Sequence, residues 1–530
     1  MSTAKNPIVT VNKLKASLEA GLEAQKLLVI GQKLATGTAT EKTLITDVEE
    51  SQISTLFGER SALGCALRAV FEEYDECSGV YFPRLDVIAL EDAGESVKAS
   101  GSITLSASGA GTTVLVDCTL DVNIGGKDVS VACTKDDEIL TTIANALAAA
   151  INAADLPITA SNTDGVVALE NNNGGTVGNN TTIKVSGLSK VSGSYYLSNI
   201  QVATAEFTSG ATDPTLTSLL DVATKVRYQT LNYPYEYGTD LATDFLDSRF
   251  NVANAIKDGA AILKMTDAKA DILVALALPN SQSLVIFCNK ETTDDNFVGG
   301  EDLELDYVAS ARVSAIRALR RTEGCNIVNI TPAADNAPLD AFGGGHIASL
   351  PYFNTPTNSP LQPEGEGWTD DEVTDLETAG GSVMGNNVSG SGVILGNVIT
   401  TYKTDAAGNA DTTWKYLNSV DVMSVSAEYI FTNAKLDFVQ SRLTAGNIVR
   451  GYNMINERVF IANLQEYYLA LANIALVPKS KAALDFFTDS LSIVVNTVTG
   501  KITSSADFPI VVQLRQVIVN LKTNFSQSLV

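Results

Sequence analysis

The sequence predicts a multidomain α/β (α+β) protein with a discontinuous α/β core domain, an inserted β-rich α+β module and extended terminal arms. Apolar runs typical of strands buried on both faces alternate with helical patterns before residue 95 and again after residue 207. Between these positions, short β-prone runs are separated by Gly, Asn and Ser. With 530 residues, the chain is also longer than a single core of about 250 to 300 residues allows.

The first part of the core is expected over residues 23–94, after an N-terminal arm over residues 1–22. The run KLLVIGQ is typical of a short buried strand. In GERSALGCALRAVFEEY the apolar positions recur at helical spacing, and GVYFPRLDVIAL returns to a strand-like composition. These runs predict the order strand, helix and strand, which the polar segment EDAGESVKASG then interrupts.

The inserted module is expected over residues 95–207. Its clearest element is a β-hairpin that turns at Gly125 and Gly126, because apolar residues alternate with polar ones on both sides of this pair. The stretch DDEILTTIANALAAAINAA has a large apolar residue at every fourth position behind an acidic first turn. We therefore expect one helix packed on a small sheet.

The core is expected to resume over residues 208–331, with helices at 214–226, 239–256 and 301–321 between apolar runs. Residues 332–392 are rich in Pro, Gly, Asn and acidic residues and predict an elaborated loop with one short helix, in TDDEVTDLETAG.

The C-terminal part of the core is expected over residues 393–506. A hairpin-like segment comes first, and two long helices are predicted at about 416–440 and 453–476. The second helix carries two apolar stripes and should be buried on both. Turns should then lead into a C-terminal arm strand over residues 507–530, whose apolar positions change phase at Arg515 and Gln516. This change predicts a bulge, or two short strands joined by a polar hinge.

Composition argues against several functional classes. The net charge of −25 disfavours a nucleic-acid partner. The N-terminus lacks the apolar core of a secretory signal and no run of 18 apolar residues occurs, so we expect a soluble protein without membrane insertion. The six cysteines are scattered and predict reduced thiols, with a disulfide between Cys118 and Cys133 left open.

No residue pattern predicts catalysis, a metal or a cofactor. The one histidine, His346 in FGGGHIASL, has no partner at a recognisable spacing, and no phosphate-binding loop is present. The segment TDAAGNAD at residues 404–411 does not match an EF-hand and predicts a hairpin turn.

Four arginines crowd the second half of the helix expected at 301–321, namely Arg312, Arg317, Arg320 and Arg321. They can compensate the helix dipole and pair with Glu301, Asp302 and Glu304 of neighbouring subunits or loops. Alternatively, they form a face for an acidic partner.

Several segments, in this order, resemble the contractile tail sheath family of Mu-like bacteriophages. They are LLVIGQKLATGTA, STLFGERSALGCALRAVFEEY, LDVNIGGKDVSVACTKDDEILTTIANALAAAINAADLPITA, VITTYKTDAAGNADTTWKYLNSV and FPIVVQLRQVIVNLK. The resemblance covers nearly the whole chain. The 332–392 region looks longer than usual for the family, and the N-terminal segment NPIVTVNKLKASLEAG is only loosely similar.

The resemblance implies a non-enzymatic virion protein, assembled in the host cytoplasm, that forms stacked hexameric rings around a tail tube. The helical polymer would contract and drive the tube through the host envelope for genome ejection. It also implies baseplate and tail terminator proteins as partners. For the four arginines we hypothesise a contact with the tube or with a neighbouring subunit. The terminal arms would pair with neighbouring subunits through Ile8, Val9, Val11, Ile510, Val512, Leu514, Val517, Val519 and Leu521.

Three alternatives stay open at this point. A sheath from a tailocin or another contractile injection system cannot be distinguished from a phage sheath by one chain. A surface adhesin or S-layer-like protein would account for the β-rich module but predicts export, and no export signal is seen. An acidic α/β enzyme is also compatible with the core pattern alone.

Overall fold

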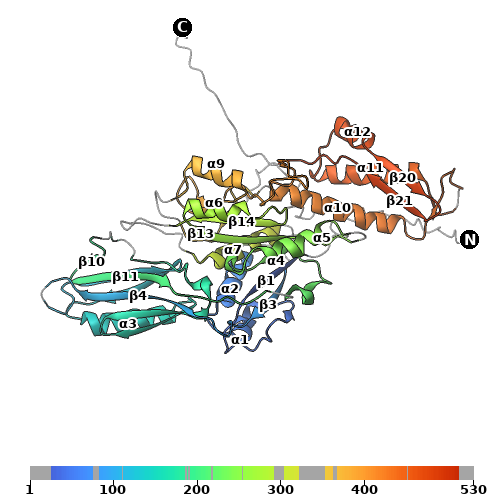
Figure 1. The fold of residues 1–530 in the computed structure, drawn as a ribbon. Helices are drawn as coiled ribbons and strands as arrows, with labels where there is room; N and C mark the ends of the chain where they lie inside the picture. The colour runs from blue at the N-terminus through green and yellow to red at the C-terminus, as the bar shows by residue number, and fades with distance from the viewer. Residues whose placement is uncertain are drawn as a thin grey trace, which may run out of the picture.

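The computed structural model describes most of the chain. The described residues are 25–75, 83–109, 111–185, 188, 191–216, 219–252, 255–291, 304–320, 352–361, 367–449 and 452–512. Within them, helices and several sheets are mixed, as the predicted α+β class requires. Figure 1 shows the inserted module at one end, the core in the middle and a C-terminal lobe at the other end.

The core is built on a sheet of six described strands in the order β14-β13-β12-β1-β3-β2. All neighbours are parallel except β2, which runs antiparallel to β3. The chain therefore leaves β3, forms the module, and re-enters on the other side of β1 as β12. The strands are β1 (Lys26–Gln32), β2 (Leu44–Ile45), β3 (Arg84–Leu90), β12 (Thr230–Asn232), β13 (Ala260–Asp267) and β14 (Leu284–Lys290).

Helices cover both faces of this sheet, which explains why its strands are apolar throughout. On β1, Leu27 and Val29 pack with α2 and α7, whereas Leu28 and Ile30 pack with α6 and α9. The helices are α1 (Ile53–Phe57), α2 (Ala62–Asp75), α4 (Asp240–Ala242), α5 (Ser248–Phe250), α6 (Lys269–Ala277), α7 (Asp306–Arg320) and α9 (Asp370–Ala379). Helix α9 begins with a capping box between Thr369 and Glu372, in the segment where the short helix was predicted.

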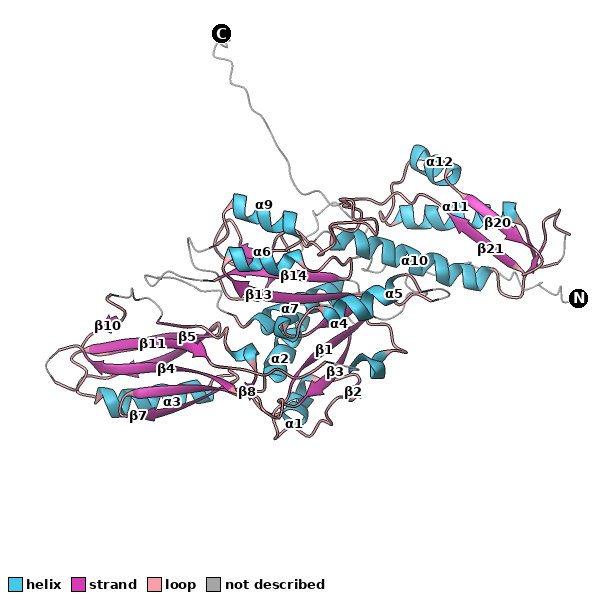
Figure 2. Cartoon of the chain, in the orientation of Figure 1, coloured by secondary structure: helices cyan, strands magenta, loops and turns pink. Residues whose placement is uncertain are grey.

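The inserted module has one hydrophobic core shared by two sheets and a helix (Figure 2). The described strands form sheets in the orders β10-β11-β4-β8-β7 and β6-β5-β9. The predicted helix is confirmed as α3 (Ala144–Ala153), preceded by a π-turn at Ile139–Ile143. The strands are β4 (Lys98–Ala107), β5 (Cys118–Ile124), β6 (Lys127–Cys133), β7 (Ile158–Thr163), β8 (Val166–Gly174), β9 (Ile183–Val185), β10 (Tyr195–Leu197) and β11 (Ile200–Thr208).

The predicted hairpin of the module is confirmed as β5 and β6. Ile124 pairs with Lys127 across a two-residue turn. Gly125 and Gly126 have φ angles of 55° and 85°. This turn favours glycine because both of its central residues need a positive φ.

Buried hydrogen bonds tie the module to the core. Asn173 lies at the end of β8. Its side-chain nitrogen donates to the Lys33 carbonyl at 3.0 Å and to Asp92 at 2.9 Å, and its side-chain oxygen accepts from the backbone amide of Ala62 at 2.9 Å. Gln32 donates to the Gly174 carbonyl at 2.6 Å. Because these groups are buried, losing one partner would leave the other without a hydrogen bond, which costs about 1–3 kcal/mol.

The tip of the β5–β6 hairpin also rests on the core. A Cβ atom on Gly126 would lie 2.7 Å from the Cα atom of Glu304, so the tip touches the segment that leads into α7. Arg312 on α7 lies nearby and forms ion pairs with Glu304 at 2.7 Å and with Glu73 at 3.7 Å. The backbone amide of Asn358 donates a hydrogen bond to Glu73 at 2.8 Å. Carboxylates therefore gather behind the hairpin around one guanidinium group.

The C-terminal lobe consists of α10 (Leu417–Asp437) from Val422 onward together with α11 (Glu457–Asn473), α12 (Lys481–Asp489), β20 (Ser492–Asn496) and β21 (Lys501–Ser505). The two long helices were predicted within a few residues of these bounds. Two small sheets also occur among the described residues. One consists of β15 (Pro356–Thr357), β16 (Met384–Asn386) and β17 (Val393–Leu395), and the other of β18 (Arg442–Leu443) and β19 (Met454–Ile455).

Two expectations for local structure were wrong. Residues 493–509 were expected to be turns, but most of them belong to the antiparallel hairpin β20–β21. The helix expected at 214–226 is a 3₁₀ helix at Leu219–Ala223 within the described residues. The hairpin was missed because Val494 and Val495 are consecutive and obscure the alternation of a strand, whereas at 214–226 the apolar residues do recur at helical spacing and the local pattern alone did not decide the outcome.

Stability should fall as pH rises toward neutrality because of Glu73. Burial raises the pKa of this carboxyl to about 7. Between about pH 4.5 and 7 the folded protein therefore keeps a proton on Glu73 that the unfolded chain has released. The free energy of unfolding is highest, as far as Glu73 is concerned, below about pH 4.5, and it falls as pH rises toward 7. We expect the fall in the free energy of unfolding between pH 4.5 and 7.5 to be smaller by on the order of 2 kcal/mol in Glu73→Gln, measured by urea unfolding at each pH.

Burial also raises the pKa of Glu236 to about 8, so Glu236 contributes in the same direction. The comparison of wild type with Glu73→Gln isolates the Glu73 share. An unchanged pH slope in the variant would contradict the assignment.

Candidate assembly surface

The described residues contain no group of three or more His, Cys, Asp or Glu side chains arranged to hold a metal ion. Among the described helices, none is long and apolar enough to cross a membrane. His346 lies outside the described residues. The segment at 404–411 forms the predicted turn, closed by a bridge between Thr404 and Ala410, and Asp405 accepts the backbone amides of Ala407 and Asn409.

The structure buries two of the four arginines that were candidates for a partner contact. Arg312 is 3% exposed and Arg317 is 1% exposed. Arg312 pairs with Glu304, Glu73 and Glu72 of the same chain. The charges of Arg312 and Arg317 are thus used inside the subunit, which corrects the expectation that these two side chains face a tube or a neighbour. The Arg320 side chain and Arg321 lie outside the described residues.

Arg317 joins α7 to α10 in the interior. It donates to Asp421 at 2.6 Å and to the Thr230 hydroxyl at 2.8 Å. Asp421 is fully buried and also accepts the hydroxyl of Tyr352. A buried charge is tolerated only when a partner of opposite charge and further hydrogen bonds satisfy it. The pair therefore holds the first half of α10 in one position on the core.

A second buried arginine fastens the middle of α10. Arg227 pairs with Glu428 at 2.5 Å and with Asp258 at 2.8 Å, and it donates to Ser424 at 3.0 Å. Arg227 and Glu428 were not predicted as functional residues. No local sequence pattern could indicate this ion pair, because the two residues lie 201 positions apart along the chain.

Helix α10 belongs to both parts, because Arg227 holds its middle to the core while Val422 and Val425 are already buried with residues of the lobe. The lobe has its own cluster of buried residues, including Leu464, Tyr467 and Leu471 of α11. Tyr468 stacks on Phe487 of α12 with ring centroids 4.9 Å apart, and Phe508 meets the same Phe487 edge-on at 5.7 Å. Aromatic pairs of this kind add about 0.5–1.5 kcal/mol each beyond their buried area.

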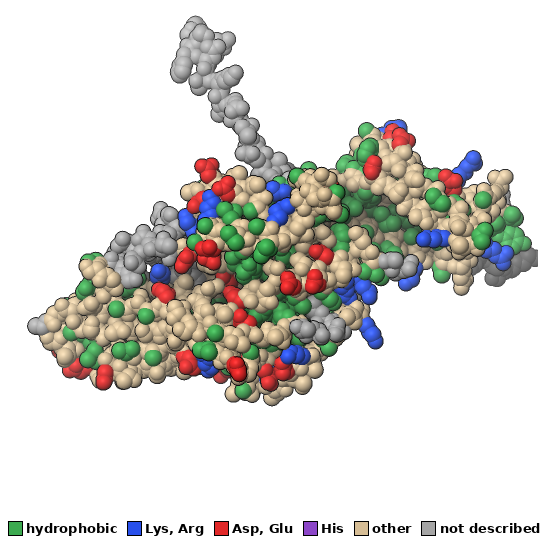
Figure 3. Space-filling model, viewed as in Figure 1, with side chains coloured by type: hydrophobic (Ala, Val, Ile, Leu, Met, Phe, Trp, Pro, Cys, Tyr) green, Lys and Arg blue, Asp and Glu red, His purple; other side chains and the backbone are tan. Residues whose placement is uncertain are grey.

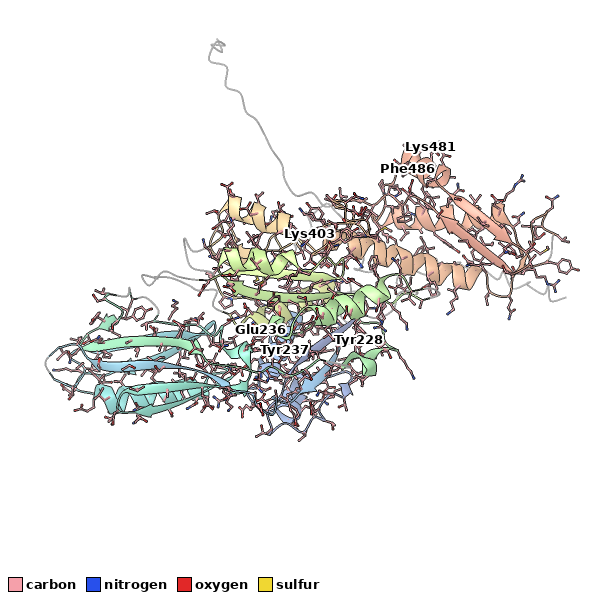
Figure 4. All side chains as sticks on the ribbon, viewed as in Figure 1. Tyr228, Glu236, Tyr237, Lys403, Lys481 and Phe486 are labelled. Carbon is pink, nitrogen blue, oxygen red and sulfur yellow. The ribbon has the colours of Figure 1, made fainter. Side chains whose placement is uncertain are left out.

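Only one of the two predicted apolar stripes of α11 is buried. The stripe with Leu464, Tyr467 and Leu471 faces the lobe core, but Leu469 on the other stripe is 47% exposed. Phe486 on α12 is 54% exposed, and Figure 4 places it beside Lys481 on the outer side of the lobe. Figure 3 shows hydrophobic side chains gathered in a hollow between the core and the lobe.

The hairpin β20–β21 is an isolated two-stranded sheet. Its strands pair from Ser492 with Ser505 to Asn496 with Lys501, and no other described strand pairs with either of them. Val494 is 62% exposed and Val498, at the turn, is 94% exposed. Two strands alone are marginally stable in water, and unpaired strand edges are templates for pairing with another chain. We call this hairpin and the exposed apolar side chains of α11 and α12 the assembly surface.

The end of the described chain runs along the lobe. The Asp507 amide donates to Ser490 at 2.9 Å, and the Val511 amide donates to the Leu476 carbonyl at 3.1 Å. Ile510 packs against the lobe core, whereas Val512 is 63% exposed. Residues 510–512 form no strand within the subunit. The other predicted arm residues, Ile8, Val9, Val11, Leu514, Val517, Val519 and Leu521, lie outside the described residues.

Comparisons with known proteins find similarity among solved structures. The sheath tail protein Lin1278 from Listeria innocua has a TM-score of 0.44 and 11% identity, covering 94% of each chain. The contracted helical sheath of the anti-feeding prophage has a TM-score of 0.43 and 10% identity, covering 99% of this chain and all of that chain. The sheath tail protein DSY3957 from Desulfitobacterium hafniense has a TM-score of 0.40 and 10% identity, covering 89% and 90%. No family model and no curated protein matches the chain.

Removing the Arg317 side chain should strongly destabilise the core. Arg317→Ala leaves Asp421 charged and buried without its ionic partner, which costs about 3–5 kcal/mol. The measurement is urea-induced unfolding followed by circular dichroism. The control is Lys269→Ala, which breaks an exposed pair with Asp375 and should leave the midpoint unchanged. Equal shifts in the two variants would contradict the role given to Arg317.

Proposed function

We propose that this chain is the structural subunit of a contractile tail sheath. The subunits polymerise as stacked hexameric rings around a tail tube, and contraction of the polymer drives the tube through the host envelope. The observation that carries the proposal is the open β20–β21 hairpin, whose edges have no partner among the described strands. The ordered sequence resemblance to the sheath family of Mu-like phages supplies the biological context.

Strand addition gives a physical route to such a polymer. An extended arm that pairs with an open sheet edge gains backbone hydrogen bonds and places alternate side chains in contact with the receiving surface. The β20–β21 hairpin offers edges on which an arm can add, and the chain ends provide β-prone segments at residues 7–11 and 513–522. The arms of one subunit would thereby complete the two-stranded sheet of another.

The rest of the subunit suits a part that moves as a rigid body. The buried pairs of Arg317 and Arg227 fix α10 to the core, and the hydrogen bonds of Asn173 fix the inserted module. Contraction can then rotate whole subunits while the arms bend between them, as in other transitions in which packed units move about their connections. Conformational energy stored in the assembled polymer would replace catalysis.

The partners and location follow from this function. The chain would bind itself in rings, the tube inside the sheath, the baseplate at one end and the tail terminator at the other. It would be found in the tail of a virion and be assembled in the host cytoplasm. A tailocin or another contractile injection system uses the same architecture, and the genes that surround this one would distinguish these cases.

Deleting residues 513–530 should abolish polymerisation and leave the subunit folded. The lobe core retains Phe508 and Ile510 in this truncation, so its packing is preserved. The expected result is an unchanged thermal midpoint, with monomers in place of long hollow cylinders under negative-stain microscopy. Cylinders formed by the truncated chain would contradict an essential C-terminal arm.

A single charge on the open hairpin should also block assembly. Val494→Lys puts an ammonium group on the exposed side of β20, and charged side chains on edge strands prevent pairing with other chains. We expect at least a tenfold fall in the polymerised fraction, measured by sedimentation. The matched control is Val388→Lys, at a fully exposed valine outside the lobe, which should assemble as wild type does. If both variants assemble equally well, the hairpin is not an assembly edge.

A further inference from the structure

Two cysteines face each other across the β5–β6 hairpin of the inserted module. Cys118 at the start of β5 is the direct partner of Cys133 at the end of β6. The Cys133 thiol donates to the Val131 carbonyl at 3.6 Å. Cys118 is partly exposed, whereas Cys133 is 1% exposed.

The geometry of this pair suits a disulfide. Directly opposed residues on antiparallel strands have Cα atoms about 4.5–5.5 Å apart. Disulfides span Cα separations of about 4.4–6.8 Å. Both side chains leave the sheet on the same face because opposed residues share a face. The backbone therefore needs little displacement to join the two sulfur atoms.

The remaining described cysteines are not in such a position. Cys65 on α2 and Cys288 on β14 are buried in other clusters of the protein. Cys77 and Cys325 lie outside the described residues. Among the described residues, the pair on the hairpin is thus the site where two thiols are already neighbours and one of them meets solvent.

We propose that Cys118 and Cys133 form a reversible redox site, which is reduced during assembly in the cytoplasm and closes to a disulfide in an oxidising medium. The oxidant is a soluble disulfide. The Cys118 thiolate attacks one of its sulfur atoms and releases one thiol, and Cys133 then attacks the mixed disulfide at the Cys118 sulfur and releases the second. The two cysteines lose two protons and two electrons, and the soluble disulfide is reduced to two thiols.

Burial raises the pKa of both thiols, and that of Cys133 to about 11, so the thiolate fraction at neutral pH is small. The exchange should accordingly be slow at pH 7 and faster as pH rises. This slow exchange would keep the hairpin reduced during assembly and allow it to close over longer exposure.

The bridge would stiffen a contact between domains. It closes the loop that contains Gly125 and Gly126, and this turn rests on Glu304 of the core. Constraining such a loop stabilises the folded state mainly by reducing the freedom of the unfolded chain. The module would thereby hold its position on the core more firmly after oxidation. The disulfide itself concerns the module alone, whereas the reduced state during assembly rests on the proposed function.

Peptide mapping can test the site because trypsin cleaves after Lys127 and separates the two cysteines. The full-length chain with Cys77→Ser and Cys325→Ser is incubated with oxidised glutathione at pH 8, blocked with a maleimide and digested. We expect the peptides of residues 99–127 and 128–135 to appear as one linked species. Dithiothreitol should separate them, and oxidation should raise the thermal midpoint by several degrees.

The control is Cys133→Ser on the same background, in which the linked species and the rise in midpoint should both be absent. Two results would overturn the proposal. One is that both peptides carry only maleimide after prolonged oxidation. The other is that Cys118 stops at the mixed disulfide with glutathione while Cys133 stays free.

Discussion

The buried ion pair between Arg317 and Asp421 is the constraint on which the arrangement of the subunit depends. Asp421 lies one turn into α10 and Arg317 lies near the end of α7, so the pair fixes two long helices to each other. Neither charge reaches water, and each must therefore meet the other in one relative position of the helices. Helix α10 then carries this position outward into the C-terminal lobe.

The two ends of the molecule are attached to the core in different ways. The inserted module is joined by several buried hydrogen bonds and by the tip of its hairpin, which distributes the attachment over a broad contact. The lobe continues from α10, whose middle is held by the ion pairs of Arg227. In a polymer, forces that act on the lobe would reach the core along this helix, because the lobe packs on α10 from Val422 onward.

Local patterns predicted the elements whose side chains meet close neighbours in sequence. The β5–β6 hairpin was predictable because Gly125 and Gly126 allow the positive φ angles of its turn, and α3 because its apolar residues repeat at helical spacing. The hairpin β20–β21 was missed, because Val494 and Val495 are consecutive and obscure the alternation of a strand. The stripe of α11 with Leu469 was expected to be buried because a sequence pattern cannot show which apolar face lacks a partner within one chain.

The sequence by itself determined the α+β class, the discontinuous core with its inserted segment, the long C-terminal helices and the resemblance to contractile sheaths. All of these follow from hydrophobic periodicity and from the order of segments along the chain. Only the tertiary structure decided what the charged residues do. The sequence left Arg312 and Arg317 open between pairing with acidic residues such as Glu304 and forming a face for an acidic partner, and in the structure they pair with Glu304 and Asp421 in the interior. The reason is that an ion pair depends on distance in space, and Asp421 lies 104 positions from Arg317 along the chain.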